Sequence, residues 1–76
     1  MSGKFPWNDA AVLVLLDDPE ARQIVAEGTL RQMANRIAAR PTADWHRFLI
    51  SLPDRGAPPF AYRAADFDAL VWALAS

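Results

Sequence analysis

Three short runs that are typical of helix starts constrain the fold of this 76-residue chain more than any other feature. They are Asp18 with Pro19, residues 29–32 and residues 42–45, and each precedes apolar residues at helical spacing. Asp and Thr are favoured at helix N-caps because the side-chain oxygen accepts a hydrogen bond from a free N–H group of the first turn. Proline is tolerated at the first helical position, where its missing N–H group has no partner to lose. The three runs therefore predict several short helices.

The first half of the chain is expected to hold three of these helices. Asn8 is placed to cap a first helix over about 9–17, which is apolar nearly all round. Residues 19–40 are expected to form two helices, because Gly28 suits the end of one and Thr29 suits the start of the next. Thr29 and the Gln three residues later form a capping-box pattern, in which each side chain accepts from the other residue's backbone N–H.

The second half is expected to hold two more helices, over residues 42–52 and about 65–75. Thr42 is placed to cap the first of them. Four apolar side chains of that helix fall at i, i+3, i+4 and i+7, namely Trp45, Phe48, Leu49 and Leu52. Six side chains of the bundle are expected to be buried, namely Leu16, Ile37, Phe48, Leu49, Leu70 and Val71.

We therefore predict an all-α fold, a single-domain bundle of four to five short helices over residues 1–76. Residues 1–7 are expected to form a loose N-terminal arm, and residues 53–60 a proline-rich loop. The alternative is a small α+β domain of order β-α-β-β-α, with strands at residues 11–16, 47–52 and 60–63. The helix-start signal at Thr42 and the helical spacing after it favour the bundle.

Composition argues against several classes of function. The chain has no cysteine, and its longest apolar run, residues 10–16, is far shorter than the roughly 20 residues of a membrane-spanning helix. The single histidine, His46, has no neighbouring group that suggests catalysis or metal binding. The adjacent carboxylates Asp17 and Asp18 stand where a helix cap is expected. We therefore expect a cytoplasmic protein that is not an enzyme, with no catalytic residue, metal, cofactor or small-molecule ligand.

The distribution of charge leaves nucleic-acid binding open. Residues 22–63 contain seven arginines and three acidic residues, whereas both ends of the chain are acidic. Residues 30–40 and 42–52 together imitate a helix-turn-helix motif, whose second helix reads the major groove of DNA. Its candidate contacts are Arg31, Arg36, Arg40 and Arg47. The overall formal charge of −1 weakens this reading, because small DNA-binding domains usually carry a strong basic footprint.

Protein binding is the interpretation that the sequence favours. The chain has eight aromatic residues, many for one small core, and aromatic side chains and arginine are enriched at protein interfaces. Trp72 and Ile50 lie off the apolar faces of their predicted helices, and Tyr62 lies in the segment before the last helix. These three residues are the candidate interface. We expect a small bacterial or phage domain that binds another protein or a second copy of itself as a homodimer.

Overall fold

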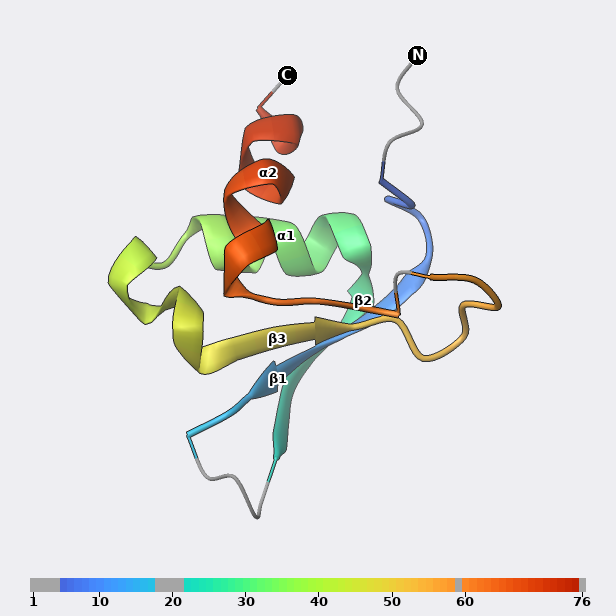
Figure 1. The fold of residues 1–76 in the computed structure, drawn as a ribbon, viewed down its shortest axis with the longest axis horizontal. Helices are drawn as coiled ribbons and strands as arrows, with labels where there is room; N and C mark the ends of the chain where they lie inside the picture. Colours follow the sequence, from blue (N-terminus) through green and yellow to red (C-terminus); the bar gives the residue numbers. More distant parts are fainter. Residues whose placement is uncertain (1–4, 18–21, 59, 76) are drawn as a thin grey trace.

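The structure, a computed structural model, describes residues 5–17, 22–58 and 60–75. Within these residues the chain forms a four-stranded sheet, two α-helices and one 3₁₀-helix (Figure 1). In chain order the elements are β1 (Ala10–Leu15), β2 (Gln23–Thr29), α1 (Leu30–Ala38), the 3₁₀-helix η1 (Thr42–Arg47), β3 (Phe48–Ser51), β4 (Ala61–Tyr62) and α2 (Ala64–Leu74). The predicted all-α bundle is therefore wrong, and the fold is α+β.

The sheet is antiparallel throughout, in the order β2-β1-β3-β4. β1 is central, and its Leu13 lies opposite Ala26 on one side and Ile50 on the other. Ile50 in turn lies opposite Tyr62 of β4. β1 and β3 are thus inner strands, whereas β2 and β4 form the two edges.

The helices cover one face of this sheet (Figure 1). Alternate side chains of a strand point to opposite faces, so Leu13, Phe48 and Ile50 share the face that packs against α1 and α2. The core residues of the two helices are Leu30, Met33, Ala34, Ile37, Phe67 and Leu70. Val14 and Leu49, which lie opposite each other, are buried on the other face of the sheet and are separate from this core.

The first predicted helix, over about 9–17 with Asn8 as its cap, is instead strand β1. Its apolar run has the composition of a buried helix and equally that of an inner strand, since both of its faces are shielded. Pairing with β2 and β3 on its two sides decides in favour of the strand. The alternative β-α-β-β-α order placed strands over ranges that overlap β1, β3 and β4, but it omitted β2.

The predicted helix after residue 18 is also wrong where the chain is described, because Gln23–Thr29 forms β2. Asp18 and Pro19 themselves lie outside the described residues. Gly28 does not end a helix but lies in β2 opposite Ala11. A Cβ atom at Gly28 would meet the side-chain oxygen of Gln32, so a larger residue here would displace that side chain from its hydrogen bond with Thr29.

The capping box at Thr29 is confirmed. The Thr29 N–H group donates to Gln32 Oε1 at 2.9 Å, and the Gln32 N–H group donates to Thr29 Oγ1 at 3.2 Å. Two further N–H groups of the first turn of α1 are satisfied by the N-terminal segment, because Leu30 donates to the Asp9 carbonyl and Arg31 to the Trp7 carbonyl. β2 and α1 are therefore joined with no intervening loop.

The predicted fourth helix is replaced by η1 and β3. Thr42 is the first residue of η1 and caps nothing. Trp45 still points into the core, where its indole N–H donates to the Ile37 carbonyl at 3.0 Å. The helical spacing after Thr42 is thus produced by a six-residue 3₁₀-helix followed by a short strand, whose Phe48 and Ile50 face the core.

The last predicted helix is confirmed, since α2 lies within one residue of it at each end. Of the six predicted core residues, Ile37, Phe48, Leu49 and Leu70 are buried, whereas Leu16 and Val71 are half-buried. Phe5 and Trp7, from the arm that was expected to be loose, pack against the core. The described part of residues 53–60 contains no helix or strand.

Candidate functional site

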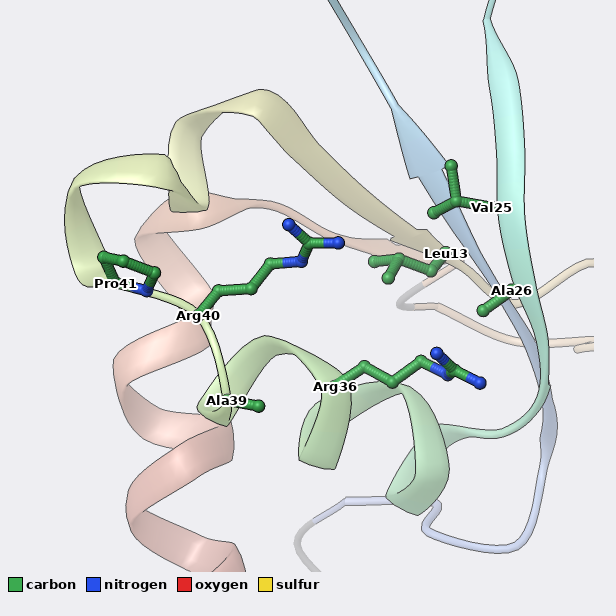
Figure 2. A pocket seen from close by; sticks show the side chains of 7 residues that line it. All are labelled: Leu13, Val25, Ala26, Arg36, Ala39, Arg40 and Pro41. Atoms are coloured by element: carbon green, nitrogen blue, oxygen red, sulfur yellow. The ribbon is translucent and has the colours of Figure 1, made fainter.

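A cleft of about 440 Å³ lies between β2 and the C-terminal end of α1 (Figure 2). Its lining residues are Leu13, Val25, Ala26, Arg36, Ala39, Arg40 and Pro41. Two guanidinium groups stand on the α1 side, and apolar side chains from β1 and β2 form the opposite side. In the described part of the chain, no acidic residue lines this cleft.

The end of α1 positions the two arginines. Arg36 lies in the last turn of α1, and Arg40 lies two residues after Ala38, where the helix ends. Carbonyl groups at a helix C-terminus favour positive charge, which accounts for arginine at this end. Figure 2 shows the Arg36 side chain extended from α1, and the Arg40 side chain from the segment that follows it, toward the side of β2 that carries Val25 and Ala26. Both arginines are solvent-exposed.

The Arg40 side chain is held in place by an aromatic ring. Its Cζ atom lies 4.5 Å from the centroid of the Phe48 ring, which is itself buried. A guanidinium over a ring face is attracted by the π electrons and keeps its N–H groups free to donate at the edges. Within the described residues neither Arg36 nor Arg40 forms an ion pair. Among the residues that the structure describes, the two cations of the cleft therefore have no counter-charge.

An irregularity in β2 shapes the opposite wall. Ala26 lies opposite Leu13, but Ile24 lies opposite Val14, so Val25 is an extra residue in the ladder. Such a β-bulge breaks the strict alternation of side chains and can bring two consecutive residues to the same face. Val25 and Ala26 accordingly both line the cleft. Because this segment was predicted to be a helix, Val25 and Ala26 were not among the candidate site residues.

The other two candidate nucleic-acid contacts lie elsewhere and are engaged. Arg47 pairs with Asp17, with 2.8 Å between Arg47 Nε and Asp17 Oδ1, and a second contact joins Nη2 and Oδ2. This hydrogen-bonded pairing lowers the pKa of the Asp17 carboxyl and raises the pKa of Arg47. Arg31 lies over the Trp7 ring, 5.2 Å from Cζ to the centroid. The predicted helix-turn-helix is absent, because residues 42–52 contain η1 and β3.

The structure does not bring together the three candidate interface residues. Ile50 and Tyr62 are core residues, 0% and 5% exposed, so neither side chain is available on the surface. Burial also raises the pKa of the Tyr62 hydroxyl. Trp72 is 77% exposed on α2. Ile50 was placed on a helix surface by the sequence analysis, whereas in β3 it alternates onto the helix-covered face of the sheet.

A second basic cavity, of about 490 Å³, lies beside β3 and β4. Arg22, His46 and Arg63 contribute its polar groups, and Leu49 and Phe60 contribute to its apolar surface. Arg63 also begins α2, where its backbone N–H donates to Asp66 Oδ2 at 3.1 Å. The α1–β2 cleft adjoins the edge strand β2, which has seven residues. The second cavity adjoins the other edge strand, β4, which has only two. We therefore take the α1–β2 cleft as the candidate site.

Among the described residues, no group of three or more His, Cys, Asp or Glu side chains is placed to hold a metal ion. In the same part of the chain, neither α-helix has the length and hydropathy needed to cross a membrane. Comparisons of the chain with protein-family models, with curated proteins and with solved structures found no match.

Proposed function

We propose that this protein is a protein-binding domain that receives an acidic side chain of its partner in the α1–β2 cleft. The observation that carries the proposal is that two guanidinium groups, Arg36 and Arg40, line one cleft beside an apolar wall, with no acidic residue among the described residues that line it. Arginine is suited to this role because its planar fork of N–H donors matches a carboxylate in two parallel hydrogen bonds.

The wall of the cleft supports the same assignment. Val25 and Ala26 offer apolar surface for the aliphatic part of an Asp or Glu residue or for its neighbour in the partner. The stacking of Arg40 on Phe48 restricts one guanidinium before a partner arrives. Ordering of a long side chain opposes binding, so a side chain that is already positioned loses less entropy in the complex.

The charge pattern favours a protein ligand over a nucleic acid. Duplex binding usually depends on several cations that contact successive phosphates, and it weakens steeply as salt rises. Here Arg47 pairs with Asp17 and Arg31 lies over Trp7, which leaves two of the four predicted contacts in the cleft. Two neighbouring guanidiniums match one or two carboxylates better than they match a phosphate backbone.

Selection from a displayed library of random peptides tests this proposal. Peptides selected on the wild-type domain should contain an acidic residue beside apolar residues. The double variant R36Q/R40Q should bind the same peptides at least about tenfold more weakly, because the carboxylate loses both charged partners. The matched control is R31Q/R63Q, which removes the same charge at positions outside the cleft and should bind as the wild type does.

Two outcomes would overturn the proposal. One is selection of peptides without acidic residues that bind R36Q/R40Q as tightly as the wild type. The other is binding of a DNA duplex of about 20 base pairs that competes with the peptides and falls steeply with salt. The second outcome would assign the two arginines to phosphate groups.

A further inference from the structure

We infer that the acidic segment of the partner binds as an additional strand, pairing with the outer edge of β2 while its carboxylates enter the α1–β2 cleft. The inference rests on the proposed function and specifies how that function is carried out. Adding a strand to an exposed sheet edge is a recurrent way to bind an extended peptide, with main-chain hydrogen bonds providing affinity and side-chain pockets providing specificity.

β2 has an open edge. In the described part of the chain it pairs only with β1, so the backbone groups along its outer side have no neighbouring strand. It is seven residues long, and most of it is solvent-exposed. Ile24 and Val25 are 56% and 41% exposed, which is unusual for large apolar side chains on an edge strand. An unpaired edge of this kind is a ready template for another chain.

The usual protection of an edge is weak in β2. Natural sheets blunt their edges with charged side chains, especially lysine, with proline, with very short strands or with bulges. Gln23–Thr29 contains neither lysine nor proline, and its protective features are the bulge at Val25 and the one charged residue, Glu27. That bulge also turns Val25 and Ala26 toward the cleft. The bulge therefore places two residues of the edge strand in the same cleft as the arginines, and it also increases the twist of the strand.

The geometry of the edge defines the sequence pattern of the partner. In an added strand, alternate side chains would point to the helix-covered face, where Arg36 and Arg40 extend toward β2 (Figure 2). Side chains on the same face of a strand are roughly 7 Å apart, so two acidic residues separated by one residue would lie beside two guanidiniums. The intervening side chains would lie on the other face, beside the exposed Ile24. The partner segment thus alternates acidic and apolar residues.

A second copy of this chain fits the edge less well. The one acidic residue of β2 is Glu27, which lies opposite Val12 and therefore points away from the helix-covered face. In a symmetric antiparallel pairing of two β2 strands, like faces remain together, so Glu27 of one copy would not approach the cleft of the other. Charge complementarity therefore selects a different, acidic partner.

The test uses the acetylated and amidated octapeptide Thr-Val-Asp-Val-Asp-Val-Thr-Gly. At about 1 mM peptide, the outward N–H groups of β2 in the ¹⁵N-labelled domain should exchange with solvent more slowly than in the free domain. Two N-methylated forms of the peptide, each methylated on alternate residues, separate its two backbone edges. The form methylated on the edge that faces β2 should bind at least about tenfold more weakly, and the other should bind as the parent does.

A matched pair of domain variants provides the second readout. Ile24→Asp places a negative charge on the open edge, whereas Phe60→Asp places the same charge on a side chain of similar exposure, 53%, outside the cleft. Ile24→Asp should weaken binding of the acidic octapeptide at least about fivefold by like-charge repulsion, and Phe60→Asp should leave it unchanged. Both positions are exposed, so both variants are expected to fold.

The results distinguish this inference from the proposed function. Unchanged exchange of β2, equal binding of both N-methylated forms, or no binding of the octapeptide would overturn strand addition. If the peptide library still yields acidic peptides that depend on Arg36 and Arg40, the proposed function stands without it. If the octapeptide binds but R36Q/R40Q binds it equally well, the role of the cleft is wrong. If the domain instead dimerises through β2, the strand added to this edge comes from a second copy of the chain, and the inference of an acidic partner is wrong.

Discussion

The two edges of the sheet are built in different ways. The β4 edge is only Ala61–Tyr62, and one residue later the chain enters α2, whose Phe67 and Leu70 are core residues. Tyr62 itself is buried. The β2 edge is seven residues long and exposes Ile24 and Val25. Short edge strands are protected against pairing with other chains, whereas long exposed strands are not.

This difference separates stability from binding within one small domain. The helices place their large buried side chains against the centre of the sheet, and α2 does so directly after β4. In the described residues, the outer edge of β2 pairs with no other strand, and the α1–β2 cleft lies beside β2. We therefore expect truncations near β4 to affect folding, whereas truncations on the outer side of β2 affect binding.

The largest expected effect is the contrast between Leu70→Ala and Ile24→Ala. Leu70 is fully buried on α2, so its truncation should lower the free energy of unfolding by roughly 2–5 kcal/mol through lost burial and a residual cavity. Ile24 is largely exposed, and its truncation should change the free energy of unfolding by less than about 0.5 kcal/mol. Urea unfolding measures both, and equal losses would contradict the separation of the two edges.

A smaller effect is expected at the junction of β2 and α1. Thr29→Ala removes the oxygen that accepts from the Gln32 N–H group and should destabilise the domain by about 1 kcal/mol. Thr42→Ala is the matched control, because Thr42 caps nothing and its loss should be nearly silent. The two melting temperatures give the comparison. A loss at Thr42 equal to that at Thr29 would show that η1 is capped in solution.

The smallest effect concerns Tyr62 on the β4 edge and is confined to alkaline pH. Burial raises the pKa of Tyr62 above its ordinary value of about 10, so the folded state holds the hydroxyl proton more tightly than the unfolded state. Stability from this group is complete below about pH 10 and is lost as the pH rises through the folded pKa. Tyr62→Phe should flatten this loss in melting temperatures measured from about pH 8 to about pH 11. An unchanged alkaline slope would show that the hydroxyl is solvated.

The features that were predicted correctly are those formed by nearby residues. The capping box at Thr29 joins residues three apart, and α2 has its buried Phe67 and Leu70 at helical spacing. β2 was missed because Gly28 and Thr29 together are typical of a helix end followed by a helix start. In the structure the same pair ends a strand and starts a helix.

The candidate site was predicted only in part. Arg36 and Arg40 stood among four candidate contacts, and the local sequence does not distinguish them from Arg31. They differ from Arg47 because Arg47 pairs with Asp17, which lies thirty residues earlier in the chain. The apolar wall depends on the register of β2 on β1.

The sequence by itself determined the absence of cysteine, the cap that starts α1 and the helix α2. The cap and the helix depend on hydrogen bonds between residues three or four apart and on a local apolar spacing. The tertiary structure alone decided that the apolar runs in residues 10–15 and 48–51 are strands. It also decided that two arginines line a cleft beside the edge strand β2. The reason is physical: a strand satisfies its backbone groups with residues distant in the chain, so its formation depends on pairing that no local pattern contains.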